Sequence, residues 1–128
     1  MIFKLKVSQQ TEDIFKMLDQ RSNLKPYVLV KHAIAWSVRE KTPLSEKDFS
    51  TDTQGLELNR QTITGNYDAY FKAVIEQYEG RRLSDDEYFP RYVKAHIDRG
   101  AMVLNAMFQH AGSFDAYLLR VLGIGDTV

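Results

Sequence analysis

Residues 3–40 read FKLKVSQQTEDIFKMLDQRSNLKPYVLVKHAIAWSVRE, and this segment predicts one strand followed by two helices. Apolar side chains alternate over the first five of these residues with two basic ones, Lys4 and Lys6. An alternation with a period of two is typical of a half-buried strand, whose apolar side chains face a core. We therefore expect a short strand that holds both lysines in solvent.

Two helices follow this strand. Ser8 can cap the first, over residues 9–23, because its hydroxyl can accept from an unpaired backbone N–H of the first turn. Pro26 suits the start of the second, since the N–H that proline lacks would be unpaired there in any case. The second helix is predicted to run to about Glu40 and is too apolar for a solvated surface. It must therefore be buried by this chain or by a second copy.

The order strand, helix, helix is that of a ribbon-helix-helix unit, in which two copies pair their strands. Such a ribbon can enter the major groove of DNA. Lys4 and Lys6 would then reach into the groove, and the helix start near Lys25 would meet a phosphate. Alternatively, the strand begins a mixed fold and its lysines only keep an exposed edge soluble. The residues leave both interpretations open.

The rest of the chain predicts mostly helix. Residues 41–65 show no sustained period and predict a long loop or extended arm, in which Leu56 and Leu58 could form a short strand. Residues 66–128 predict helices that end at glycines. We expect a mainly α fold in a single compact domain, with a ribbon-helix-helix-like front over residues 1–40.

The composition is that of one globular domain. The chain has 128 residues, 44% of them hydrophobic and 27% charged, and its net charge is zero. Residues 1–47 hold nine basic and five acidic residues (+4), and the remainder holds eight and twelve (−4). A net charge of zero excludes a uniformly basic surface of the kind that coats nucleic acid. The basic front is one way to contact a polyanion, although four charges on a small domain also arise without function.

Patterns for catalysis, metals and membranes are missing from the sequence. It has no cysteine, glycine-rich phosphate loop, GxSxG turn or HExxH pair. The three histidines do not cluster, and we expect them to be surface or half-buried polar residues. The acids at 85–87 are better explained as helix-dipole partners than as ligands of a divalent cation. With no membrane span or signal segment, we expect a cytoplasmic protein without enzyme activity, cofactor or metal.

Three blocks of the sequence resemble the DndE family, the small subunit of bacterial DNA phosphorothioation (sulfur-modification) systems. They are SQQTEDIFKMLDQRSNLKPYVLVKHAIAWSVRE (8–40), LNRQTITGNYDAYFKAVI (58–75) and AHIDRGAMVL (95–104). One departure is Lys25, which stands where a Thr or Ser usually caps the helix before Pro26. This position therefore loses a neutral cap and gains a positive charge.

The resemblance implies a non-enzymatic accessory protein that binds the DNA backbone, with nicked duplex as a proposed preference. It also implies a homo-oligomer, a dimer or tetramer, that works beside other subunits of the phosphorothioation complex. The alternatives are a ribbon-helix-helix transcriptional regulator or antitoxin, and a protein scaffold that does not touch DNA.

Two groups of candidate site residues follow from these interpretations. Arg60 could contact a phosphate or a carboxylate of another subunit, or could only hold the long loop against Asp68 or Glu57. Gly100 lies on an apolar helix stripe, which favours a close helix crossing. The expected DNA-binding residues are Lys4, Lys6, Lys25, Lys31 and Arg60; the expected interface residues are Trp36, Tyr67, Tyr70, Arg99 and Gly100.

Overall fold

The structure is a computed structural model that describes residues 1–123. It is mainly helical, as the sequence predicts, with one small sheet. In chain order the elements are β1 (Lys4–Lys6), α1 (Gln9–Ser22), α2 (Pro26–Ser37), α3 (Glu46–Phe49), β2 (Glu57–Asn59), α4 (Arg60–Ile63), the 3₁₀ turn η1 (Gly65–Tyr67), α5 (Asp68–Glu79), α6 (Asp85–Glu87), the π-helical segment η2 (Tyr88–Val93), α7 (Lys94–Ala111) and α8 (Phe114–Val121).

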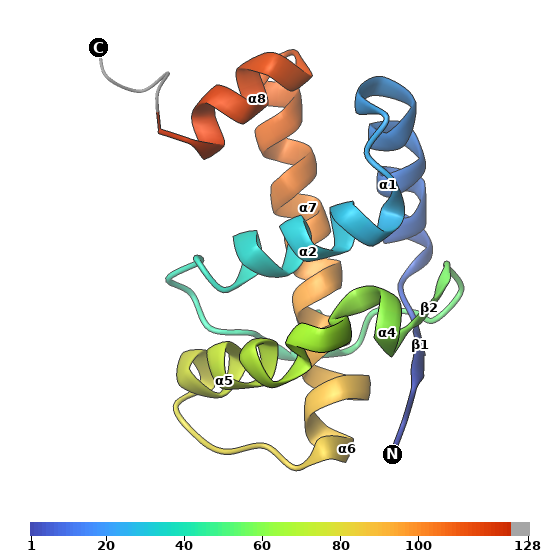
Figure 1. Ribbon diagram of the computed structural model, residues 1–128, viewed down its shortest axis with the longest axis vertical. Helices are drawn as coiled ribbons and strands as arrows, with labels where there is room; N and C mark the ends of the chain where they lie inside the picture. The colour runs from blue at the N-terminus through green and yellow to red at the C-terminus, as the bar shows by residue number, and fades with distance from the viewer. Residues whose placement is uncertain (124–128) are drawn as a thin grey trace.

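Helix α7 runs through the middle of the molecule, and the other helices pack around it (Figure 1). Helices α1 and α8 lie against the same half of α7, whereas α5 contacts η2, which leads into α7. Helix α2 crosses α7 at Gly100. The crossing is close because residue 100 has no side chain: a Cβ there would overlap the backbone of Ala33. The contact that Gly100 permits thus joins two helices of one chain.

Strand β1 pairs with β2 in an antiparallel sheet, and the middle residue of each strand is buried. The half-buried strand and the short strand near Leu58 are both confirmed. The partner of β1 differs from the ribbon-helix-helix expectation, because residues 41–65 fold back and supply the second strand from the same chain. The register places Lys4 opposite Asn59, Leu5 opposite Leu58 and Lys6 opposite Glu57.

Local signals explain where the helices begin and end. The Ser8 hydroxyl accepts from the backbone N–H of Thr11 at 3.1 Å, and Pro26 is the first residue of α2. Asn23 ends α1 with a left-handed φ of 60°. Pro90 lies within η2, where wider turns accommodate its missing N–H, so the chain continues into α7.

One hydrophobic core lies between α7 and the elements around it. Residues 41–65, expected to be a loop or extended arm, contain α3, β2 and α4. Among residues 1–123, no helix combines the length and apolar character needed to cross a bilayer. The large buried side chains include Phe15, Leu18, Leu29, Ile34, Ile63, Ile75, Tyr88, Phe89, Ile97, Leu104 and Tyr117.

Candidate functional site

The two lysines of β1 form an exposed basic pair. Leu5, between them, is only 6% exposed, so Lys4 and Lys6 extend from the opposite face of the strand. Within the described residues neither lysine is part of an ion pair. Glu57 stands opposite Lys6 in the sheet and reduces the local charge, whereas the residue opposite Lys4 is neutral. Both ammonium groups are therefore accessible to an external anion.

The lysines near α2 have different surroundings. Lys25 is exposed at the N-cap of α2, makes no side-chain cap hydrogen bond, and lies 3.4 Å from Asp19. The Lys31 Nζ donates to the backbone carbonyls of Tyr27 at 2.9 Å and Thr62 at 2.8 Å. Partial burial also lowers the pKa of Lys31. Lys31 thus links α2 to α4, and Lys25 is the more accessible of the two.

Arg60, the first residue of α4, is buried and uses its side-chain donors inside the chain. Nε and Nη2 donate to the carboxylate of Asp68 at 3.2 and 2.8 Å, while Nη1 and Nη2 donate to that of Asp85 at 3.1 and 2.7 Å. Nη1 also donates to the carbonyl of Ile2 at 3.1 Å. The guanidinium has five N–H donors, so none remains for a phosphate. The alternative, in which Arg60 holds its loop against Asp68, describes this geometry.

Arg60 also determines the charge of its two partners. Its hydrogen bonds hold the pKa of Asp85 below the ordinary value. Burial alone would raise the pKa of Asp68, but hydrogen bonds from Arg60, Thr64 and Tyr88 outweigh that effect and lower it. The three groups are therefore all ionised at neutral pH. Together they join α4, α5 and α6 to the start of the chain.

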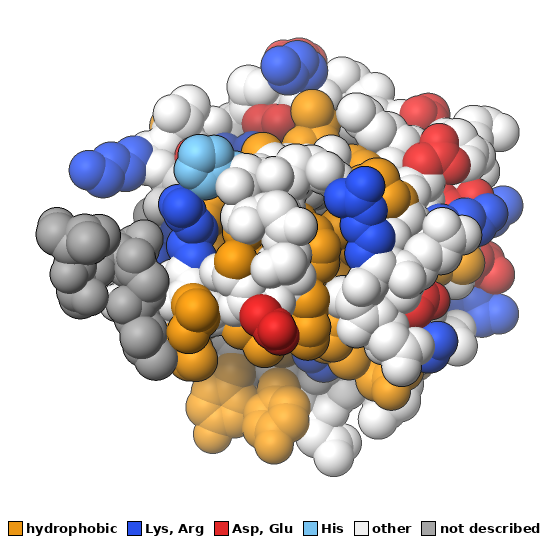
Figure 2. All heavy atoms as spheres, turned by 90° about the horizontal axis from the view of Figure 1, so that it is seen from above, with side chains coloured by type: hydrophobic (Ala, Val, Ile, Leu, Met, Phe, Trp, Pro, Cys, Tyr) orange, Lys and Arg blue, Asp and Glu red, His pale blue; other side chains and the backbone are white. Residues whose placement is uncertain are grey.

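The expected DNA-binding residues consequently do not form one surface on a single chain. Helix α1 separates β1 from Lys25, and its 14 residues span about 21 Å at 1.5 Å per residue. Basic and acidic side chains are interspersed on the face shown in Figure 2. A single chain therefore offers the pair of Lys4 and Lys6, with Lys25 set apart from it.

Three of the expected interface residues contact other parts of the same chain. The Trp36 indole N–H donates to the Tyr117 hydroxyl at 3.0 Å. Arg99 donates to the side chain and the carbonyl of Ser37 at 2.9 and 2.7 Å. Gly100 lies at the crossing of α2 and α7. These contacts give all three residues a role in the packing of one chain.

Tyr67 and Tyr70 are the two expected interface residues that remain on the surface. They are 63% and 70% exposed, and their ring centres lie 6.1 Å apart. Exposed aromatic side chains are enriched at protein interfaces. These tyrosines are therefore available to a partner.

A buried carboxylate that sequence reasoning missed joins three segments. Asp98 is 3% exposed and accepts from the Ser8 backbone N–H at 3.1 Å, the Thr11 hydroxyl at 2.7 Å, the Thr51 hydroxyl at 2.5 Å and the Lys94 ammonium at 2.7 Å. Only the four-residue spacing of Lys94 and Asp98 is visible in the sequence. The other donors lie at least 47 residues away along the chain. Asp98 ties the start of α1 and the segment before β2 to α7.

His96 is fully buried, which corrects the expectation of a surface or half-buried histidine. Its Nδ1 lies 2.7 Å from the Ser37 hydroxyl, which also accepts from Arg99. The Ser37 proton is therefore free to bind Nδ1, and these bonds place the ring proton on Nε2, 3.6 Å from Glu79. Burial and the charge of Arg99 lower the pKa of His96 to about 3. Ser37 is also fully buried, so neither its hydroxyl nor the His96 ring is exposed to solvent.

Two of the three acids at residues 85–87 have partners within the protein. Asp85 binds Arg60, and Glu87 closes a capping box with Ser84. The part of the chain that the structure describes contains no group of three or more side chains suited to hold a metal ion.

Comparison with known proteins identifies the family. The sequence model of the family described as DNA sulphur modification protein DndE matches residues 4–111 of this chain, which is 108 of its 128 residues. The fold is similar to that of DndE from Escherichia coli B7A, involved in DNA phosphorothioation modification, with a TM-score of 0.64 and 22% identity over 79% of this chain and 96% of that one. A glycine-to-lysine DndE mutant involved in DNA phosphorothioation matches with a TM-score of 0.63 and 22% identity over 80% and 97%. No curated protein matches the sequence. Since the family model covers most of its length, the chain belongs to the DndE family of DNA sulphur modification proteins.

Proposed function

We propose that this chain is a non-enzymatic accessory subunit of a DNA phosphorothioation system that binds the DNA backbone as a homo-oligomer. Family membership supplies the context of DNA modification. The observation that carries the DNA-binding part is the exposed pair of Lys4 and Lys6, which lacks an ion-pair partner in residues 1–123. Lysines contribute phosphate contacts that position a protein on DNA but carry little sequence information.

The free edge of β1 supports the oligomeric part of the proposal. Phe3 and Val7 form backbone hydrogen bonds toward the β2 side of the sheet, at 2.6 and 3.0 Å. Hydrogen bonding alternates along an antiparallel strand, so the backbone groups of Lys4 and Lys6 point away from β2. No other strand in residues 1–123 pairs with β1. A second copy paired along this edge would bring four lysines onto one ribbon.

A protein scaffold that does not touch DNA is the second candidate. It is favoured by the zero net charge of the chain and by the internal contacts that use all five side-chain donors of Arg60. A ribbon-helix-helix regulator is less well supported, because the family model places the chain among DNA sulphur modification proteins.

Fluorescence anisotropy with labelled intact and nicked duplexes of one sequence, at several salt concentrations, tests the proposal. We expect salt-sensitive binding that the double variant Lys4→Glu, Lys6→Glu abolishes. Lys16→Glu, Lys47→Glu is the matched control, since it makes the same charge change at two exposed lysines elsewhere. Absence of binding at low salt, or equal losses in both double variants, would overturn the proposal. A higher affinity for the nicked duplex would identify the preferred DNA structure.

A further inference from the structure

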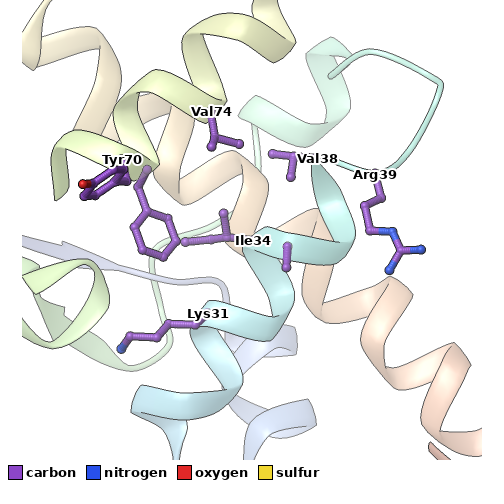
Figure 3. A pocket seen from close by; sticks show the side chains of 8 residues that line it. Lys31, Ile34, Val38, Arg39, Tyr70 and Val74 are labelled. Atoms are coloured by element: carbon purple, nitrogen blue, oxygen red, sulfur yellow. The ribbon is translucent and has the colours of Figure 1, made fainter. Parts of the chain in front are cut away.

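A groove apart from β1 lies between α2 and α5 (Figure 3). Its volume is about 400 Å³. Lys31, from α2, and Arg39, from the turn that follows α2, flank an apolar lining. The apolar residues are Ile34, Ala35 and Val38 from α2 and the segment that follows it, and Tyr70, Phe71 and Val74 from α5.

The groove continues onto an apolar face that nothing in the described chain covers. Tyr70 is 70% exposed and Val74 is 47% exposed, and they lie one turn apart on α5. Ala35 is exposed on the α2 side. Ile75 is the one fully buried residue of α5, and Ala69, Tyr70, Ala73, Val74 and Gln77 are exposed. Exposed apolar faces of this kind mark interaction sites.

Two cations without acidic partners flank this apolar lining. Lys31 lies within α2, and Arg39 lies in the turn after its last residue, Ser37. Neither takes part in an ion pair among residues 1–123, and α2 contains no acidic residue. Carbonyl oxygens hold the Lys31 ammonium, and the Arg39 guanidinium lies 4.7 Å from the ring centre of Trp36. Both positive charges are therefore held in place without being neutralised.

We propose that this groove binds an amphipathic helix of another protein, apolar toward the groove and carrying a carboxylate near each end. Acidic side chains seven or eight residues apart on such a helix are separated by about 10–12 Å. One would face Lys31 in α2 and the other Arg39 in the turn after it. Docking of an apolar helix face into a groove is a common recognition mode. DNA fits this site poorly, because phosphates would lie against an apolar lining. The inference uses family membership but not DNA binding, so either can fail alone.

The probe is an array of 18-residue peptides tiled across the other proteins of the same phosphorothioation system, incubated with the labelled full-length chain. Bound peptides should have apolar residues at helical spacing and acids near both ends. Ala35→Arg and Val74→Arg, two exposed positions on opposite sides of the groove, should each weaken binding at least tenfold. Arg39→Glu should weaken it about fivefold and should favour peptides whose acids are replaced by lysine. Lys16→Glu, Lys47→Glu should leave peptide binding unchanged.

Several results would overturn the proposal. The proposal fails if no peptide of the array binds or if the bound peptides lack acidic residues. It also fails if Ala35→Arg and Val74→Arg both leave peptide binding unchanged. Self-association of the wild-type chain that Ala35→Arg abolishes, without peptide binding, would show that a second copy occupies the groove. Circular dichroism of each variant distinguishes a loss of binding from a loss of folding. Because Ala35→Arg and Val74→Arg lie on different helices, the test needs only one of these two variants to fold.

Discussion

Replacing Arg60 by methionine removes the cation that Asp68 and Asp85 share. The substitution keeps a long apolar stem against the ring of Phe89, which lies 4.7 Å from the guanidinium carbon. It removes all five hydrogen bonds through which the Arg60 side chain joins α4 to α5, α6 and the start of the chain. We expect lower stability, with DNA affinity unchanged in the folded protein.

The magnitude follows from the burial of the three groups. Removing one partner of a fully buried ion pair costs about 3–5 kcal/mol. The Arg60 side chain is 10% exposed, but the carboxylates of Asp68 and Asp85 are 28% and 32% exposed. Water can therefore solvate part of each carboxylate once the cation is gone, which reduces the expected loss to about 2–4 kcal/mol.

Urea unfolding followed by circular dichroism, at equal protein concentrations, measures this loss. With a slope of about 2 kcal/mol per molar urea, the midpoint should fall by about 1–2 M. Lys16→Met is the control, because it breaks a surface pair with Glu12 whose lysine is 70% exposed, and such pairs contribute less than about 1 kcal/mol.

The difference between wild type and the Arg60 variant should depend on pH. The pKa values of Asp68 and Asp85 are lowered in the folded chain. Their contribution is therefore complete above the ordinary aspartate pKa of about 4 and is lost as the pH falls through the lowered values. A variant within about 0.5 kcal/mol of wild type at pH 7, or a gap that persists unchanged at pH 2, would refute the reasoning. Unchanged stability with a weaker salt dependence of DNA binding would restore Arg60 as a phosphate contact.

Three further substitutions test the packing of the fold. Gly100→Ala should lower the urea midpoint far more than Gly80→Ala, because a Cβ at residue 100 overlaps the backbone of α2. A Cβ at residue 80 meets nothing within 4 Å, so only the strain of its positive φ of 77° remains; equal midpoints would contradict the close crossing. Asp98→Asn should reduce the free energy of unfolding by about 3–5 kcal/mol, since the Lys94 ammonium loses its buried counter-charge; a loss below about 1 kcal/mol would show that the amide replaces the carboxylate. Wild type should lose roughly 1.4 kcal/mol of unfolding free energy per pH unit as the pH falls from about 6.5 toward 3, because the unfolded histidine binds a proton that the buried His96 ring excludes. His96→Gln should remove this loss. An identical pH slope in wild type and variant would mean that His96 does not cause it.

Local features of the fold were predictable from the sequence. The alternation around Leu5 identifies β1, and the side chain of Ser8 and the missing N–H of Pro26 mark two helix starts. The glycine on the apolar stripe of α7 indicates a close helix crossing. Each of these signals depends on neighbouring residues or on the intrinsic geometry of one residue, so a single sequence contains it.

The contacts that determine the site are long-range, and the sequence contains little trace of them. Strand β1 pairs with residues more than fifty positions later, so periodicity could not distinguish pairing within the chain from pairing between copies. The second partner of Arg60, Asp85, and three of the four donors to Asp98 are likewise distant. An arginine in a phosphate site and one between two carboxylates use the same donors, so only the fold separates the two roles.

The salt dependence of DNA binding tests the proposed role of β1 most directly. Each neutralised phosphate contributes about −0.9 to the slope of log K against log salt concentration. Two chains paired along β1 would present Lys4 and Lys6 twice, which predicts a slope of about −3.6 for a dimer. The double variant Lys4→Gln, Lys6→Gln should bring the slope close to zero while the circular dichroism spectrum stays unchanged. A wild-type slope that this variant leaves intact would contradict DNA binding through β1.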